Sequence, residues 1–201
     1  GVAGGTSVII TGSDLGGAPA GKFDATNATS FFNYDSTSIN ATSPAGSVGT
    51  VDVTVTTAGG TSATSAADKF SYVAFAPTIS AAFSPTAIPA NGSTQTILTM
   101  TISNPNPTAF SQVEFSVTLP SQLGFHGYGG TCSAGAVGST TITVRVMPLA
   151  ANASCDVTFF FVATTPGGPY SITTSAISST SPTTTGSSAT TPTGVTVQPL
   201  A

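Results

Sequence analysis

The chain has 201 residues, of which 5% are charged, and its three basic and seven acidic side chains give a net charge of −4. Ordinary globular proteins carry roughly 25% charged residues. Lys22, Lys69 and Arg145 are too few to neutralise the phosphates of a nucleic acid, which excludes nucleic acid as a partner. The longest apolar run, residues 159–163, is far shorter than the roughly 20 residues of a membrane helix, so we expect no membrane insertion.

The first third of the chain predicts short strands at residues 8–11, 22–23, 29–34 and 37–42, separated by Gly, Ser, Asn and Asp. Residues 50–57 then alternate strictly, with Val51, Val53 and Val55 on one side and threonines on the other. This period of two is typical of a half-buried strand. A turn at Gly59-Gly60 and a last strand at 70–73 complete a pattern that predicts an all-β sandwich.

Four segments resemble the IPT/TIG domain, an immunoglobulin-like fold: GGTSVIITG (4–12), TSINATSPAG (37–46), GTVDVTVTTAGGTS (49–62) and DKFSYV (68–73). The resemblance implies a proline-containing first strand ahead of the GGT segment, and residues 1–3 do not supply it. We therefore predict an open edge strand at Thr6, Val8 and Ile10, completed by a strand from outside residues 1–201.

The rest of the chain predicts a second antiparallel sandwich over residues 79–201, after a first domain at 1–74 and a Pro-bearing linker at 75–78. The fold class expected for the whole chain is thus two immunoglobulin-like antiparallel β-sandwiches in tandem. The Ser/Thr/Gly/Pro-rich stretch 175–193 is interpreted as a long surface loop. The strands of this half are expected at residues 94–103, 113–119, 140–146, 154–163, 170–176 and 194–198.

This second half resembles bacterial surface-repeat domains of uncharacterised function that occur in tandem in very long secreted proteins. The resemblance rests on SPTAIPANGSTQTILTMTISNPNPTAF (84–110), VTLPSQLGF (117–125) and Cys132 together with ANASCDVTF (151–159).

Cys132 and Cys155 are the two cysteines, and we predict that they form one disulfide in an oxidising compartment. Closing this loop would stabilise the fold by roughly 3 kcal/mol in the chain-entropy model. The alternative is a pair of buried free thiols. A zinc site is not expected, because the lone His126 and two cysteines leave one ligand short.

No set of residues predicts catalysis, a cofactor or a metal: the seven acids are not paired at a spacing that would bring them together. The stretch around Phe125, His126 and Tyr128 is the candidate contact loop, with the aromatic rings as a platform for a sugar or, alternatively, as packing over the end of the sandwich. Four N-x-S/T sequons are candidate glycosylation sites, namely Asn27, Asn40, Asn91 and Asn152.

The sequence therefore predicts a non-enzymatic structural module of an extracellular or cell-surface bacterial protein, such as a stalk, spacer or filament subunit. Its expected partners are copies of itself or neighbouring modules of the same chain. The alternative is a carbohydrate-binding or adhesin module of a larger secreted protein, with surface glycans as partners.

Overall fold

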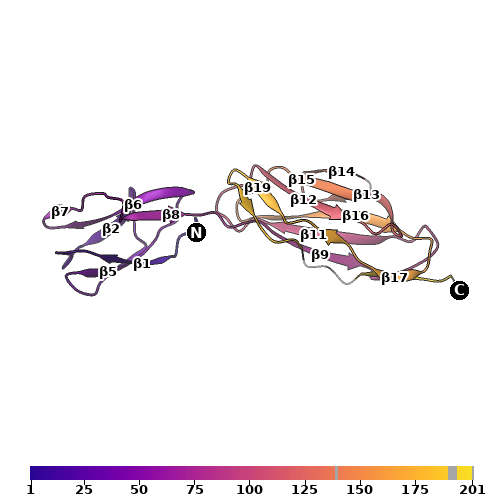
Figure 1. Ribbon diagram of the computed structural model, residues 1–201, viewed down its shortest axis with the longest axis horizontal. Coiled ribbons are helices and arrows are strands. Elements are labelled where there is room, and N and C mark those ends of the chain that lie inside the picture. The colour runs from indigo at the N-terminus through magenta and orange to yellow at the C-terminus, as the bar shows by residue number, and fades with distance from the viewer. Residues whose placement is uncertain (139, 190–193, 201) are drawn as a thin grey trace. The chain divides into compact units, whose positions relative to one another are not determined.

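The computed structural model describes residues 1–138, 140–189 and 194–200, and the chain forms two compact units, unit 1 (Gly1–Phe75) and unit 2 (Ala76–Ala201) (Figure 1). All regular secondary structure in these described ranges is β, as predicted. β9 begins at Thr78, the last residue of the segment expected to be a linker. The linker itself stays a prediction.

Unit 1 contains two facing antiparallel sheets. One has the order β1-β5-β4, and the other has the order β3-β2-β6-β7, with β8 also paired to β6. Its strands are β1 (Ser7–Thr11), β2 (Ala20–Phe23), β3 (Thr26–Asn27), β4 (Ser30–Asn33), β5 (Ser38–Thr42), β6 (Gly49–Thr57), β7 (Gly60–Thr61) and β8 (Lys69–Tyr72).

The alternating sequence of β6 has the predicted effect on burial. Val53 and Val55 are buried, while Thr54 and Thr56 stay half-exposed on the other face. Opposite them, β5 buries Ile39 and Ala41 from the second sheet. The core of unit 1 therefore lies between β5 and β6.

Unit 2 is a larger sandwich, with sheets β13-β16-β11-β9 and β14-β15-β12-β19-β20, β18 pairing with β12, and a small sheet β10-β21-β17. Among the described strands, β10 and β21 are the one parallel pair. The strands are β9 (Thr78–Ser84), β10 (Ala87–Pro89), β11 (Thr96–Ser103), β12 (Gln112–Thr118), β13 (Gly124–Gly130), β14 (Ala134–Val137), β15 (Thr141–Val146), β16 (Ser154–Val162), β17 (Gly167–Tyr170), β18 (Thr173–Thr174), β19 (Ser178–Thr180), β20 (Thr184–Thr185) and β21 (Val195–Gln198).

The stretch interpreted as a long surface loop contains structure of its own. β19 and β20 form a hairpin within it, and Ile177 and Ser179 are buried against the sandwich. Ser179 Oγ lies 2.7 Å from Thr184 Oγ1, so hydroxyl groups cross-link the hairpin. Its last part, residues 190–193, lies outside the described residues.

A disulfide and a buried asparagine amide hold the loops of unit 2 in place. The predicted disulfide joins Cys132, which follows β13, to Cys155 on β16, with their Cα atoms 5.0 Å apart. The buried Asn104 donates through Nδ2 to the carbonyls of Thr108 (2.8 Å) and Ala150 (2.9 Å), and its Oδ1 accepts from the backbone N–H of Asn106 (3.0 Å). The Asn104 amide is thereby the hydrogen-bond partner of backbone groups in these buried loops that have no partner strand.

The described residues form no helix long and apolar enough to cross a membrane.

Candidate functional site

β1 lies at the end of its sheet, with β5 on one side and no partner strand in the described parts of the chain on the other. Gly12 N–H donates to Thr37 C=O (3.0 Å), and Ser43 N–H donates to Thr6 C=O (2.8 Å). In the β1–β5 register these are directly opposed pairs. Since backbone groups alternate in an antiparallel ladder, Val8 and Ile10 also direct theirs to β5.

The residues between them have the opposite backbone orientation. Ser7, Ile9 and Thr11 direct their N–H and C=O groups away from β5, toward the open side of the sheet. Of the predicted edge residues, Val8 and Ile10 lie on β1 and Thr6 immediately precedes it, but the backbone groups available for pairing belong to Ser7, Ile9 and Thr11. An unpaired row of this kind is a template for another strand.

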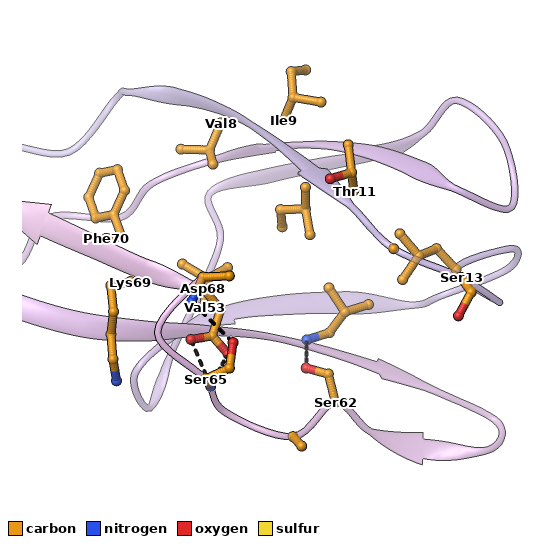
Figure 2. A pocket seen from close by; sticks show the side chains of 16 residues that line it. Val8, Ile9, Thr11, Ser13, Val53, Ser62, Ser65, Asp68, Lys69 and Phe70 are labelled. Carbon is orange, nitrogen blue, oxygen red and sulfur yellow. Dashed lines mark hydrogen bonds between the residues drawn. The ribbon is translucent and has the colours of Figure 1, made fainter.

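A groove of about 480 Å³ runs beside this edge, between the two sheets (Figure 2). Its apolar walls are Val8, Ile10 and Leu15, from β1 and the chain that follows it, and Val53, Val55 and Phe70, from the second sheet. Figure 2 shows Val8 and Phe70 toward one end and Ser13 and Ser62 toward the other, with Ile9 pointing away. The inner side of the open edge is therefore apolar.

The groove exists because the core is incompletely covered at this edge. Val8, Ile10 and Phe70 pack against the core but remain half-buried. A groove of this size has room for more than one aliphatic side chain.

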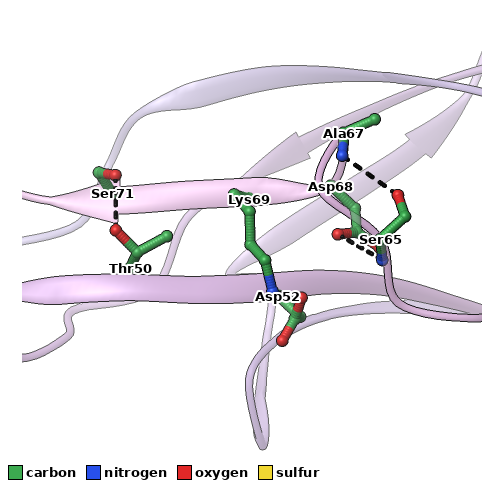
Figure 3. Close-up of polar contacts among 7 residues, drawn as sticks. All are labelled: Thr50, Asp52, Ser65, Ala67, Asp68, Lys69 and Ser71. Atoms are coloured by element: carbon green, nitrogen blue, oxygen red, sulfur yellow. Dashed lines mark hydrogen bonds and ion pairs between the residues drawn. The ribbon is translucent and has the colours of Figure 1, made fainter.

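The far wall of the groove is a loop, residues 62–68, that its own hydrogen bonds hold in place. Ser62 exchanges two bonds with Val55: its N–H donates to Val55 C=O (2.9 Å), and its Oγ accepts from Val55 N–H (3.1 Å). The Asp68 carboxylate accepts from Ser65 N–H (3.0 and 2.9 Å), and Ser65 Oγ accepts from Ala67 N–H (3.1 Å) (Figure 3). The groove is therefore preformed.

The charged groups nearby are already paired. Lys69 on β8 forms an ion pair with Asp52, its cross-strand neighbour on β6 (Figure 3). Both side chains are substantially exposed to solvent. Two charged side chains line the groove: Asp68, whose carboxylate accepts from Ser65 N–H, and Lys69, which is paired with Asp52. The other side chains that line it are apolar or carry hydroxyls.

The N-terminal segment is tied to the sandwich before β1 begins. Val2 is fully buried, donates from its N–H to Val73 C=O (3.1 Å) and accepts from Gly46 N–H (3.0 Å). Gly4 has φ +78°, and a Cβ there would lie 2.5 Å from the backbone carbon of Pro44, so the GGT segment needs glycine at this position.

The other predicted contact residues lie on β13, the edge strand of unit 2. Phe125 packs into the core, with ring centroids 6.2 Å from Phe159 and 6.1 Å from Phe161. A bulge follows it, His126 is exposed, and Tyr128 is 44% exposed. In the described chain no hydrogen bond or ring contact joins these three residues, and the ring of Phe125 faces the core.

The remaining candidates are dispersed. Asn27, Asn91 and Asn152 are exposed, whereas Asn40 is half-buried on the central strand β5. Within the described residues, no three or more His, Cys, Asp or Glu side chains are grouped so that they could hold a metal ion.

The sequence predicted an open edge at β1 but gave no sign of the groove beside it. Its far wall comes from Phe70 and residues 62–68, which are separated from β1 by about fifty positions. The alternation of Phe70 and Tyr72 indicated that β8 faces the core. It did not indicate that β8 lies across the groove from β1.

The comparisons with known proteins agree with this architecture. The family model for the IPT/TIG domain matches residues 1–72 of the 201. The chain resembles BcpA*(D312A), the major pilin subunit of Bacillus cereus, with a TM-score of 0.51 and 10% identity, over 97% of this chain and 69% of that one. This likeness supports the fold alone.

Unit-sized similarity is also found to cohesins. The seventh ScaB type I cohesin from Pseudobacteroides cellulosolvens is 12% identical, with a TM-score of 0.46, over 61% of this chain and 94% of that one. No curated protein matches the chain in sequence. The chain is thus all-β and immunoglobulin-like, and its residues 1–72 match the IPT/TIG family model.

Proposed function

We propose that the chain is a non-enzymatic structural module of an extracellular bacterial surface protein or fibre, and that a β-strand from outside residues 1–201 completes unit 1 by pairing with β1. The observation that carries the proposal is the open edge of β1 beside an apolar, preformed groove. An extended chain matches both features at once, because its backbone pairs with the edge while alternate side chains enter the groove.

The groove specifies the pattern of the added strand. Residues directly opposite each other on neighbouring strands point to the same face of a sheet. Added residues opposite Val8 and Ile10 would therefore enter the groove, toward Val53 and Phe70. At Gly12 the Leu15 side chain already packs against the backbone, so that end of the groove is partly filled.

The backbone of β1 specifies where the added strand needs donors. Ser7, Ile9 and Thr11 offer the outward-directed groups, so the added residues that face them must have a free N–H. Proline is excluded at these positions. The expected strand is thus about five to seven residues long, apolar at every second position and without an internal proline at the bonding positions.

The disulfide and the low charge of the chain support a structural rather than a catalytic role. Unit 2 is closed by a disulfide, which is typical of proteins in oxidising compartments. A nearly neutral surface, with 5% charged residues, allows copies or modules to pack side by side without repulsion.

Adding a strand to the chain tests the proposal directly. We would fuse a seven-residue strand with isoleucine at alternate positions to Gly1 through a flexible Gly/Ser linker, and compare it with a strand carrying serine instead. Burying isoleucine side chains contributes up to about 1.5–3 kcal/mol each. The isoleucine strand should raise the melting temperature of unit 1 by several degrees, and Val8→Asp should abolish the gain. Equal melting temperatures for the two strands would refute strand addition.

The source of the natural strand is a separate question. If the denatured mass of the protein from its native source is near 19.6 kDa, the strand comes from a neighbouring subunit of a fibre. A much larger mass means that preceding residues of the same chain supply it.

A further inference from the structure

The outward face of the β1-β5-β4 sheet carries large apolar side chains in the open. Ile9 on β1, Phe32 on β4 and Tyr34 just after β4 are 55%, 62% and 59% exposed. They share one face, because the inward-facing residues of the same strands include Ile10, Phe31 and Ile39. This surface is here called the aromatic face, defined by Ile9, Phe32, Tyr34 and Asn40.

The register places these residues beside one another. Ile9 and Phe32 are both opposite Asn40, on its two sides. Tyr34 N–H donates to Ser38 C=O (3.0 Å), which places Tyr34 in the adjacent row. The rings of Phe32 and Tyr34 meet edge to face, with centroids 5.3 Å apart. The two rings therefore hold each other in fixed orientations on a paired strand.

Hydroxyl and amide groups surround the rings. Asn40 Nδ2 donates to Ser7 Oγ (2.9 Å), which holds the amide in position over the centre of the face. Ser30 Oγ and Thr42 Oγ1 lie 2.7 Å apart in the next row. These groups can both donate and accept hydrogen bonds, as a hydroxyl-rich ligand requires.

The face carries no charge. β1, β4 and β5 contain no ionisable residue. The nearest residue in sequence that is charged at neutral pH is Asp35, whose carboxylate accepts from the N–H (2.7 Å) and hydroxyl (2.8 Å) of Thr37. These hydrogen bonds lower the pKa of Asp35. A charged partner would lose hydration here without gaining an opposite charge, so the face favours a neutral partner.

We infer that the aromatic face binds a neutral polysaccharide. The apolar face of a pyranose ring stacks on one of the two rings and contacts the edge of the other, since Phe32 and Tyr34 meet edge to face. Its hydroxyls exchange hydrogen bonds with Asn40 and the neighbouring serine and threonine hydroxyls. The inference does not depend on strand addition, since the added strand would use the edge and the inner side of β1, whereas the sugar uses the outer side. It also differs from the contact loop expected at Phe125, His126 and Tyr128.

The test is affinity electrophoresis of the full chain through gels containing mixed-linkage β-glucan, xylan or galactomannan, with polygalacturonate and heparin as charged comparators. We expect retardation by at least one neutral polysaccharide and none by the charged ones. Phe32→Ala and Tyr34→Ala should each weaken binding about tenfold, and the double variant should abolish it. Both side chains are exposed, so the variants should keep the parent melting temperature.

Tyr128→Ala is the matched control, because it removes an exposed tyrosine from unit 2 and should leave retardation unchanged. Phe32→Tyr should retain binding, since the ring remains. Three results would overturn the inference: no retardation by any of the neutral polysaccharides, full retardation of the double variant, or self-association in sedimentation velocity that Phe32→Ala abolishes. The last result would mean that a second copy occupies the face.

Discussion

Unit 2 buries one continuous core, whereas unit 1 divides its core into two small clusters with half-buried margins. Of the twelve largest fully buried side chains, only Phe23 and Ile39 belong to unit 1. The difference follows from edges. In unit 2 the small sheet β10-β21-β17 adds Ile88, Val195 and Val197 to the buried core, while in unit 1 the inner side of β1 faces a groove.

The comparison teaches that an immunoglobulin-like fold can be recognisable while one side of its core is uncovered. β5 pairs with β1 in one sheet and β6 pairs with β2 in the other, and these two strands supply the centre of the core of unit 1. The residues next to the open edge contribute less to the stability of unit 1, because each has packing partners on one side only. Unit 1 should therefore respond weakly to changes near the groove and strongly to changes between β5 and β6.

The largest expected effect comes from removing matched rings in the two units. Phe159 is fully buried at the centre of unit 2, so Phe159→Ala should cost about 3–5 kcal/mol. Phe31 is half-buried on β4, the other edge strand of the same sheet, so Phe31→Ala should cost only about 1–2 kcal/mol. Hydrogen exchange, measured by mass spectrometry on peptides from each unit, reports the loss of stability in each unit separately. Equal losses of protection would contradict the contrast between the cores.

The disulfide should stabilise unit 2 alone. Cys132 and Cys155 are 23 positions apart, and replacing both with serine should cost about 3 kcal/mol in the chain-entropy model. Peptides from unit 2 should exchange faster, and those from unit 1 should not change. Faster exchange in both units would mean that they fold as one cooperative block.

The strands of both units could be predicted from the sequence because alternation directly encodes a face. Leu98, Met100 and Ile102 on β11, for example, are all buried, as their positions indicated. The position of Phe125 could not be predicted, since the bulge after it changes which residues face inward. The hairpin β19–β20 was hidden by its composition, because serine and threonine hydroxyls hold it together in place of apolar pairs.

The open edge was predicted because residues 1–3 do not supply the first strand of the family pattern. The aromatic face could not be predicted, because it depends on the order of the strands in the sheet. Ile9 and Phe32 are 23 positions apart, and only the shared partner Asn40 on β5 brings them together. A sequence shows which residues alternate, but the strand order determines which outward residues become neighbours.

A smaller effect is expected at the buried hydroxyl of Tyr72, which donates to Pro44 C=O (3.0 Å) inside unit 1. Tyr72→Phe should cost about 1 kcal/mol. Burial raises the pKa of Tyr72, so the folded state retains this proton at a higher pH than the unfolded chain. The resulting stability is fully present below the ordinary tyrosine pKa of about 10 and is lost as the pH rises above it.

Urea unfolding of unit 1 at pH 8 and pH 11 measures this dependence. The parent should lose more stability between the two pH values than Tyr72→Phe does. Tyr170→Phe, in unit 2, is the control and should leave the dependence of unit 1 unchanged. Identical losses for the parent and Tyr72→Phe would mean that this hydroxyl ionises as it does in the unfolded chain.

The smallest effect is expected at the ion pairs, of which the described residues contain one in each unit. Lys69 pairs with Asp52 across β8 and β6, and Arg145 pairs with Glu114 across β15 and β12. All four side chains are more than a third exposed, so Lys69→Gln and Arg145→Gln should each cost less than about 1 kcal/mol. Salt should weaken both pairs equally. If Lys69→Gln were much more costly than Arg145→Gln in urea unfolding, the ion pair would be supporting the wall of the groove, and the stability of unit 1 would depend on its edge more than on its divided core.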